Sequence, residues 1–310
     1  MSYYLGIDGG GTKTSCAVGD ETRLLAIATA GPSNIVRVGE AQARESLERC
    51  VRQACAAAGI SLEQVTRTCV GGSGAGRPEF AAVVREIVAD MVSTPVDVVG
   101  DMQIALEAAF GAGPGVIVIA GTGSIAYGRD RAGKTLRAGG WGFAIGDEGS
   151  AHWIGRSAVS AILRASERES VDGGSRLLAE DLFKAWGVTS LSDLARAANS
   201  IPPPDFAALF PAVAASQDEV ARQVLRSAGR ELADVAATVT RRLFTGNEAA
   251  PVPVAMTGGV FRHAAIVREV FYNELGCLDA RVEVNPQVVD PVEGALQMAR
   301  SAASHAIEPR

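Results

Sequence analysis

Short glycine clusters directly after apolar strands are the feature that most limits what this chain can fold into. The chain has 35 glycines among its 310 residues, which is above the usual share of about 7%. One cluster, DGGGTKT at residues 8–14, follows the apolar segment Tyr3–Ile7, and a strand pattern resumes at Ser15–Val18. A strand, a glycine turn and a second strand in immediate succession predict a β-hairpin rather than a strand-to-helix turn.

The same pattern recurs in the second part of the chain. Val116–Ile119 is apolar, residues 120–124 read AGTGS, and Ile125–Tyr127 continues as a strand. Aligning the two glycine turns suggests a duplicated domain in which each copy begins with a glycine hairpin. The segment GAGPG at residues 111–115 breaks both helical and strand periodicity, and therefore predicts a boundary between the copies.

Strands and helices alternate along the rest of the chain. The first 110 residues or so read as β-β-α-β-α-β-α, an α/β arrangement. Helices are expected at 41–58, 78–90 and 102–110, and strands at 65–70 and 96–99. The region 151–245 is mainly helical, with a long helix at about 218–243 and no motif that indicates a function. It is followed by strand 252–256, helix 262–274, strand 280–285 and a closing helix at 291–304.

Charge and composition exclude several classes of protein. A net charge of −6 and a pI near 5.3 argue against a nucleic-acid-binding protein, which needs a basic face. The apolar run Val116–Ala120 is too short to span a membrane, and the first residues lack a basic and an apolar signal-peptide region. The sequence therefore predicts a cytoplasmic protein with no membrane partner. Cys50 and Cys55 share one helical face and are expected to be buried apolar residues.

Familiar nucleotide-binding motifs do not fit this sequence. Lys13 and Thr14 lack the preceding glycine spacing of a P-loop, and residues 9–11 do not complete a dinucleotide-binding fingerprint before a helix. Glycine turns that carry hydroxyl or acidic side chains do occur at several strand ends, where backbone N–H groups can bind anions. The sequence therefore indicates a phosphate site built from hairpin turns.

Two aspartates at strand ends are candidates for chemistry. Asp8 can position Mg²⁺, which prefers one or two carboxylates together with water and phosphate oxygens; alternatively, it stabilises the turn through a local hydrogen bond. Asp101 directly follows the apolar strand 96–99. It can act as a general base or cap the helix that starts at Met102. The sequence leaves both choices open.

The two hairpins resemble the two phosphate loops of the superfamily of acetate and sugar kinases, heat-shock chaperones and actin. Residues 139–142, GGWG, and 146–154, GDEGSAHWI, resemble the N-acetylglucosamine kinase branch of the BadF/BadG/BcrA/BcrD-type ATPases. This resemblance implies an α/β fold with two ribonuclease-H-like (actin-type ATPase) domains around a central cleft. The N-terminal domain would span residues 1–113 and be completed by helix 291–310. The C-terminal domain would span 114–290 and contain a helical insertion.

The resemblance also implies roles for individual residues. Asp101 matches the catalytic aspartate of the family. The sugar-binding set comprises Asn34, Thr122, Gly140, Trp141 and Asp147; Trp141 alone could equally be a core residue. The set that binds ATP and its phosphates comprises Gly10, Gly11, Thr12, Lys13, Thr14, Gly121, Gly123, Ser124, Gly258 and Gly259, with Asp8 on Mg²⁺.

The implied function is ATP-dependent phosphorylation of the 6-hydroxyl of N-acetylglucosamine or a related amino sugar by a homodimer. Glucosamine and N-acetylmuramic acid are alternative substrates, because they differ from N-acetylglucosamine by one acyl or lactyl group. A second alternative is an ATPase that activates a 2-hydroxyacyl-CoA dehydratase through an iron–sulfur cluster, although the five cysteines are scattered. A third is a non-catalytic sugar-responsive regulator, although the chain starts at its first strand without a DNA-binding segment.

Overall fold

The chain folds into two compact units in this computed structural model, which describes residues 2–72, 74, 77–167, 174–245 and 251–307. Unit 1 consists of Met1–Gly113 together with Val289–Arg310, and unit 2 consists of Pro114–Val288. Residues 289 and 290, which the sequence prediction assigns to the C-terminal domain, belong to unit 1 instead. They lead into a helix that packs on the sheet of that unit.

The sheet of unit 1 contains the first glycine hairpin. Its strands are β1 (Tyr3–Gly9), β2 (Thr14–Gly19), β3 (Leu24–Ala30), β4 (Val65–Gly72) and β5 (Val96–Gly100), in the order β3-β2-β1-β4-β5. β1, β2 and β3 are antiparallel, whereas β4 and β5 run parallel to β1. Gly9 pairs with Thr14 across the hairpin, so the predicted hairpin is confirmed.

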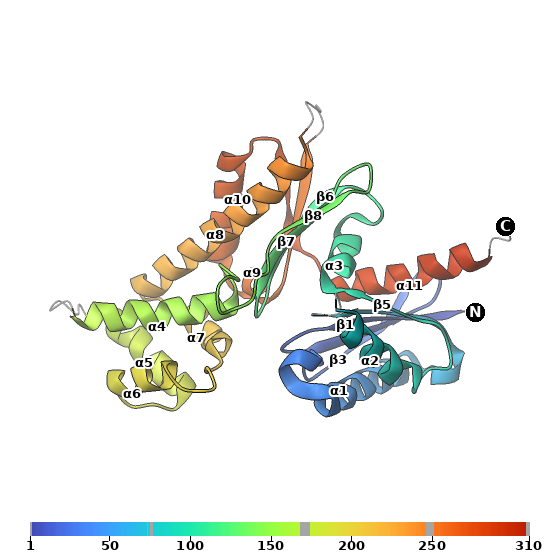
Figure 1. The fold of residues 1–310 in the computed structure, drawn as a ribbon, viewed down its shortest axis with the longest axis horizontal. Coiled ribbons are helices and arrows are strands. Elements are labelled where there is room, and N and C mark those ends of the chain that lie inside the picture. The colour runs from blue at the N-terminus through green and yellow to red at the C-terminus, as the bar shows by residue number, and fades with distance from the viewer. Residues whose placement is uncertain (1, 73, 75–76, 168–173, 246–250, 308–310) are drawn as a thin grey trace. The chain divides into compact units, whose positions relative to one another are not determined.

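Helices cover both faces of this sheet (Figure 1). α1 (Ile35–Ala58) and α2 (Pro78–Ala89) pack on one face, and α3 (Asp101–Phe110) and α11 (Pro291–Ile307) on the other; a short 3₁₀ helix, η1 (Leu62–Gln64), precedes β4. Every residue of β2 is buried as a result. A Cβ at Gly6 would overlap the backbone of Leu296, and one at Gly294 would overlap that of Ile104. Both glycines therefore permit β1, α3 and α11 to approach closely.

The sheet of unit 2 repeats the topology of the first. Its strands are β6 (Gly115–Ala120), β7 (Ser124–Arg129), β8 (Thr135–Gly139), β9 (Val252–Thr257) and β10 (Val282–Val288), in the order β10-β9-β6-β7-β8. β6, β7 and β8 are antiparallel, and β9 and β10 run parallel to β6. Strand order and direction match those of unit 1, which confirms the duplication that the repeated hairpin predicts.

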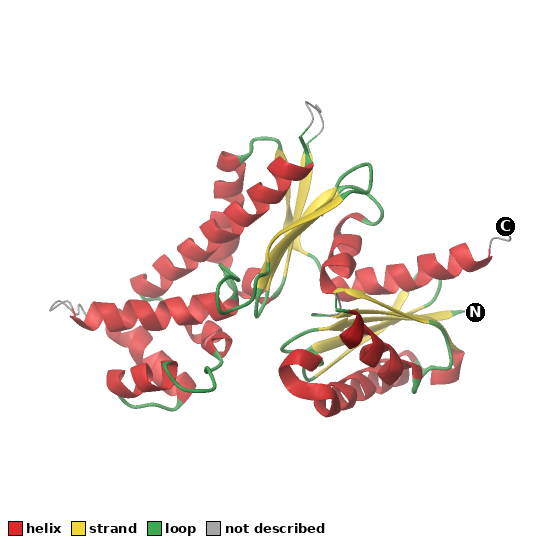
Figure 2. Cartoon of the chain, in the orientation of Figure 1, coloured by secondary structure: helices red, strands yellow, loops and turns green. Residues whose placement is uncertain are grey.

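Helices make up most of the rest of unit 2 (Figure 2). They are α4 (Ala151–Glu167), α5 (Gly174–Trp186), α6 (Leu191–Ala198), η2 (Phe206–Leu209), α7 (Phe210–Ala215), α8 (Glu219–Leu243), α9 (Gly259–His263) and α10 (Ala265–Leu278). The expected long helix is α8, which packs along β6, β7 and β8. Among the described helices, none has the length and apolar character that a membrane span requires.

Three expectations about secondary structure need correction. The strands β3 and β8 were not expected; they form one edge of each sheet. The single helix expected at 262–274 is two helices, α9 and α10, because Ala264 between them has an extended backbone (φ −116°, ψ 92°).

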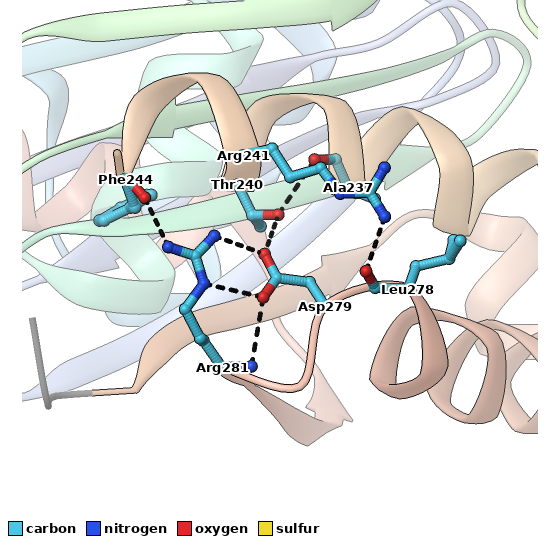
Figure 3. A network of polar contacts seen from close by, with 7 residues as sticks. All are labelled: Ala237, Thr240, Arg241, Phe244, Leu278, Asp279 and Arg281. Atoms are coloured by element: carbon cyan, nitrogen blue, oxygen red, sulfur yellow. Dashed lines mark hydrogen bonds and ion pairs between the residues drawn. The ribbon is translucent and has the colours of Figure 1, made fainter. Parts of the chain in front are cut away.

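A polar network fixes the end of α8 in unit 2 (Figure 3). The Asp279 carboxylate accepts hydrogen bonds from Arg281 Nε (2.9 Å), Arg281 Nη2 (2.8 Å) and Thr240 Oγ1 (3.0 Å). Arg281 also donates to the carbonyl of Phe244 (2.7 Å). These bonds hold the pKa of Asp279 at about 2, with the Arg281 contact as the largest cause. The network joins the end of α8 to the segment between α10 and β10.

Candidate functional site

Two carboxylates of unit 1, those of Asp101 and Asp290, act electrostatically on a third, that of Asp8. Asp8 lies near the end of β1, Asp101 directly follows β5, and Asp290 precedes α11. β1 and β5 are both parallel to β4, so Asp8 and Asp101 lie at the same edge of the sheet. Burial, followed by the charges of Asp101 and Asp290, raises the pKa of Asp8 to about 7, and the Lys13 ammonium opposes this rise. Negative charge is therefore concentrated at this edge.

Asp101 is the first residue of α3 and not its N-cap. Gly100 occupies the N-cap position, and its amide donates to Gln103 Oε1 at 2.8 Å. The Asp101 carboxylate accepts from the amide of Met102 at 2.9 Å. The capping interpretation of Asp101 is therefore wrong in its detail, because the preceding residue fills that position.

The first glycine turn lies beside Asn34. The amide of Gly10 donates to the carbonyl of Lys13 at 3.0 Å, and the Gly10 carbonyl accepts from the amides of Ser33 and Asn34, each at 3.2 Å. Asn34 is the N-cap of α1, since its Oδ1 accepts from the amide of Val36 at 3.0 Å. Its side-chain carbonyl thus has a structural role, and its NH₂ group is the part suited to a ligand.

Thr14 supports the first turn from within the unit. Its side chain is buried, and Oγ1 lies 2.7 Å from both the Gly31 carbonyl and Ser33 Oγ. Thr12 and Lys13 are exposed at the tip of the turn. Thr14 therefore holds the turn against the β3–α1 connection, and the tip of the turn is accessible to solvent.

A small apolar cavity lies next to Asn34, but it is too small to hold a sugar. The cavity holds about 10 Å³, room for about one water molecule. It is lined by Gly9, Ser33, Ile35, Val36, Leu47, Val70, Gly72, Phe80 and Val84.

The second glycine turn, in unit 2, is bracketed by residues 147–152. The amide of Gly121 donates to the Gly123 carbonyl at 2.9 Å, which closes the turn. The carbonyls of Gly121 and Thr122 accept from the amides of Ala151 (2.8 Å) and His152 (3.3 Å). Ser124 Oγ donates to the carbonyl of Glu148 at 2.6 Å. The GDEGSAH segment therefore fixes the turn, and the Ser124 hydroxyl contributes to that structure.

Asp147 joins this turn to the neighbouring loop. Its Oδ1 accepts from the amide of Gly142 at 3.3 Å, and its carboxyl also accepts from the backbone of Ser124. A Cβ at Gly123 would lie 2.8 Å from Asp147 Oδ2. Burial raises the pKa of Asp147 and the two N–H donors oppose that rise. Its φ of 60° is positive, and among the described residues Asp147 is the only non-glycine residue with a positive φ. Such backbone strain is typical of functional sites.

Trp141 lies on an exposed loop, residues 140–146, which we name the Trp141 loop. Its side chain is 69% exposed, so the interpretation of Trp141 as a core residue is wrong. The guanidinium of Arg137 lies 5.1 Å from the centre of its ring, a distance suited to a cation–π contact. Gly140 and Gly142 have positive φ values of 67° and 93°. An exposed indole on a loop shaped by glycine is suited to a sugar face.

The turn after β9 packs against the end of β6. Gly258 has a φ of 106°, and a Cβ there would overlap the backbone of Ala120. Gly259 begins α9, and a Cβ at this position would have no neighbour within 4 Å. Gly258 is therefore required by packing, whereas Gly259 leaves open space next to the second glycine turn.

The predicted residues thus gather in one set within each unit. Unit 1 brings together Asp8, Asp101, Asn34 and the first turn, and unit 2 brings together the second turn, Asp147, the Trp141 loop and Gly258. Sequence reasoning missed Asp290, whose charge acts on Asp8. Its only local signal is a following proline at the start of a helix, which indicates a helix terminus and no ligand.

Comparison with known proteins gives relatives along the whole chain. An N-acetylmuramic acid/N-acetylglucosamine kinase of Clostridium acetobutylicum is 30% identical over 308 residues, 97% of this chain and 99% of the relative. An N-acetyl-D-glucosamine kinase of Dictyostelium discoideum is 28% identical and covers 96% of this chain and 97% of its own. A Chromobacterium violaceum structure provisionally described as an N-acetylglucosamine kinase superposes with a TM-score of 0.75 at 26% identity, covering 96% of this chain and 99% of its own.

The fold and the sequence agree with one family. The similarity to the Chromobacterium structure confirms the predicted fold class, an α/β fold of the actin-type ATPases with two five-stranded sheets. The sequence matches the model of one ATPase family over residues 5–299, which is nearly the whole chain. The chain therefore belongs to the BadF/BadG/BcrA/BcrD ATPase family.

Proposed function

We propose that this chain is an amino-sugar kinase that transfers the γ-phosphoryl group of ATP to the 6-hydroxyl of N-acetylglucosamine or a closely related sugar. Membership of an ATPase family supports the use of ATP. The two full-length relatives, both kinases of N-acetylated amino sugars, support the substrate class.

One observation carries the proposal: the parallel pairing of β1, β4 and β5 places Asp8 and Asp101 at the same end of the sheet of unit 1, beside the first glycine turn. Phosphoryl transfer requires a group that accepts the proton of the attacking hydroxyl and a group that positions the cation on the phosphates. Two carboxylates at the same end of the sheet, beside a glycine turn, are suited to these two functions. Asp101 is the proposed base, because strand β5 and helix α3 hold it at a fixed position.

The donor set around Asp8 suits Mg²⁺. In the described residues no group of three or more His, Cys, Asp or Glu side chains is arranged to hold a metal by itself. Mg²⁺ is commonly held by one or two carboxylates, with water and phosphate oxygens completing the shell, so Asp8 is a sufficient protein ligand. The cation would neutralise charge on the phosphates. Asp290 adds negative charge that favours a cation at this edge.

The glycine turns are the proposed phosphate sites. In unit 1 the tip consists of Gly10, Gly11, Thr12 and Lys13, and Lys13 supplies a positive charge. In unit 2, the turn Gly121–Gly123 and Gly259, which has open space beside it, allow a phosphate to approach the backbone N–H groups closely. The hydroxyls of Thr14 and Ser124 hold these turns in shape, and we assign both residues an indirect role in binding ATP.

The proposed sugar-binding residues offer both an apolar face and polar groups. The exposed indole of Trp141 fits the apolar face of a pyranose, and the NH₂ group of Asn34 can donate to a hydroxyl. Asp147, Thr122 and Gly140 lie around the second turn and the Trp141 loop. Asp147 also joins these two segments through its carboxylate.

The cysteines argue against the alternative of a dehydratase activator. Cys16, Cys50, Cys55 and Cys69 are all buried within unit 1, and only Cys277 is exposed. Iron–sulfur clusters are held by cysteine thiolates. Burial raises the pKa of Cys50 and of Cys55 to about 11, which disfavours the thiolate. Four of the five cysteines therefore cannot reach a cluster at a subunit surface.

A coupled assay of ADP release tests the proposal. N-acetylglucosamine, glucosamine, N-acetylmuramic acid and glucose are each added with ATP and Mg²⁺, and the phosphorylated position is read by ³¹P–¹H NMR. We expect the amino sugars to stimulate ADP release and the product to carry phosphate at O6. Asp101→Asn serves as the matched control for contaminating kinases. A panel in which no amino sugar raises ADP release above the basal ATPase rate contradicts the proposal.

The proposal also includes a homodimer as the assembly, which the family resemblance implies, and the cytoplasm as the location. Sedimentation equilibrium of the purified protein tests the first. A mass equal to the 32.0 kDa chain at micromolar concentration would contradict it.

A further inference from the structure

A series of aromatic rings links the Trp141 loop to the helices of unit 2. The rings of Phe143 and His152 have centroids 5.0 Å apart, those of His152 and Phe206 5.2 Å apart, and those of Phe206 and Trp186 5.2 Å apart. The interplanar angles are 43°, 70° and 57°. Tilted and edge-to-face pairs at these separations are favourable arrangements of aromatic side chains. We name these four residues the ring series.

The ring series runs from the exposed loop into the packed interior. Phe143 is 53% exposed, His152 and Trp186 are half-buried, and Phe206 is only 8% exposed. Phe206 lies in η2, which packs tightly on α4: a Cβ at Gly155 would overlap the Phe206 carbonyl. The inner end of the series is therefore fixed by the group α5, α6, η2 and α7, which we name the helical insertion, and the outer end belongs to the Trp141 loop.

His152 connects three segments of unit 2. Its amide donates to the Thr122 carbonyl in the second glycine turn at 3.3 Å. Its ring contacts Phe143 on one side and Phe206 on the other. The glycine turn, the Trp141 loop and the helical insertion thus meet at this one residue, in the first turn of α4.

Hydrogen bonds and the ring series hold different residues of the Trp141 loop. The amides of Ile145 and Gly146 donate to the Gly142 carbonyl, at 3.3 and 2.9 Å, and the Gly142 amide donates to Asp147. Phe143 lies between these anchors, and Gly142 alone separates it from Trp141. Two glycines with positive φ give this backbone many accessible conformations when it is not held.

We propose that Phe143, His152 and Phe206 are positioning residues: they hold the Trp141 loop in the conformation that presents the indole to the sugar. The helical insertion then sets sugar affinity through Phe206 without touching the sugar. The expected effect of these residues on sugar affinity rests on the proposed function. Their expected effect on the conformation of the Trp141 loop does not depend on any substrate. Ordering a binding loop in advance lowers the entropy lost on binding.

Time-resolved fluorescence anisotropy of Trp141 tests the effect on the loop. The chain has three tryptophans, so Trp153→Phe with Trp186→Phe leaves Trp141 as the single probe while keeping a ring in the series. In this background and without sugar, Phe143→Ala and His152→Ala are expected to increase the nanosecond mobility of the indole. Tyr272→Ala is the matched control, because Tyr272 on α10 is an aromatic residue of nearly equal exposure, 54%.

Steady-state kinetics with the full set of tryptophans tests the effect on affinity. For His152→Ala we expect a rise of about 2- to 10-fold in KM for the sugar, the range that one aromatic pair supports. KM for ATP and kcat should change little, and His152→Phe should restore the sugar KM because it keeps the ring. A merely structural role for His152 would lower the amount of folded enzyme and leave both KM values unchanged.

The two measurements separate failure of this inference from failure of the proposed function. Trp141 mobility that is unchanged by Phe143→Ala and His152→Ala overturns the inference, whatever the enzyme does. Increased mobility in a protein that phosphorylates no amino sugar supports the positioning role and contradicts the proposed function. Increased mobility with an unchanged sugar KM overturns the claim that the ring series sets affinity.

Discussion

Unit 1 and unit 2 share a five-stranded sheet of one topology but carry different side chains at their strand ends. Where β1 ends, unit 1 has Asp8 opposite Ser15; where β6 ends, unit 2 has Ala120 opposite Ser124. Both units carry a glycine turn with hydroxyl side chains, but unit 1 adds the carboxylates of Asp8 and Asp101, whereas unit 2 adds one strained aspartate, Asp147. A duplicated scaffold has thus been specialised by changes at a few strand ends, with its pairing left intact.

The two sheets also differ in how they are covered. β2 is buried along its whole length by helices on both faces, whereas β7 alternates between buried and half-buried residues. β2, the strand of unit 1 that is equivalent to β7, therefore has little tolerance for larger side chains.

The comparison of the two units predicts that substitutions of the acidic residues of unit 1 alter the rate of catalysis. Substitutions in unit 2 are expected to alter sugar recognition or stability instead.

Asp101→Asn is the strongest test of this division. If Asp101 is the base, kcat should fall by roughly 10²- to 10⁴-fold, the usual contribution of positioned proton transfer. Asparagine keeps an oxygen that can accept from the Met102 amide, and Gly100 caps α3 in either case. Sugar affinity by calorimetry and the melting temperature should therefore stay near those of the parent. Turnover within about threefold of the parent would remove Asp101 from the mechanism.

Asp8→Asn tests the cation side of unit 1. Losing one carboxylate ligand should raise the Mg²⁺ concentration needed for half-maximal turnover by roughly 10- to 100-fold, comparable with the effect of changes around metal sites. Sugar binding measured without nucleotide should change little. The division between the units fails if sugar affinity collapses while the Mg²⁺ titration is unaltered.

Gly258→Ala tests packing at the strand ends of unit 2. The added methyl group would overlap the backbone of Ala120 at a positive φ, so we expect a loss of about 1–3 kcal/mol in the free energy of unfolding. Gly259→Ala is the matched control, because its methyl group would have no neighbour within 4 Å. Thermal unfolding of both variants measures the difference. Equal melting temperatures would show that β6 and β9 can separate at no cost.

Asp279→Asn has the smallest expected effect and tests a feature of unit 2 distant from the glycine turns. The folded pKa of Asp279 lies at about 2, below the ordinary 3.8. Because the Arg281 side chain is partly exposed and solvent screens the pair, the ionised form contributes about 1 kcal/mol of stability above pH 4, and this contribution is lost as the pH falls toward 2. Urea unfolding of parent and variant between pH 2 and pH 6 should give curves that converge at the acid end. Curves that stay parallel would contradict this role.

Local signals in the sequence predicted the hairpins and the long helix α8. A glycine turn between two apolar strands determines its own structure, and helical periodicity over many residues is unambiguous. β3 and β8 were missed for a physical reason: all of their residues are half-buried or exposed, so neither strand has a buried face that its sequence must supply. Their sequences, LLAIATA and TLRAG, lack the alternation that a strand with one buried face produces.

The sequence predicted the site residues that directly follow strands. It did not predict those whose position depends on contacts between segments far apart in the chain. Asp8 and Asp101 could be paired because parallel strands end at one edge of a sheet. Asp290 could not, because its proximity to Asp8 depends on a helix from the far end of the chain. The positive φ of Asp147 and the ring series through His152 likewise depend on packing between elements that no local pattern specifies.

The return of α11 to unit 1 has a consequence for synthesis. The chain leaves unit 1 after Gly113 and comes back to it only at Val289. A ribosome therefore completes the whole of unit 2 before it makes the helix that covers one face of β1, and domains fold as their sequence emerges. Unit 2 can close its core on the nascent chain, while the half with Asp8 and Asp101 is finished last. A prematurely terminated chain would keep the Trp141 loop but leave Gly6 and α3 uncovered.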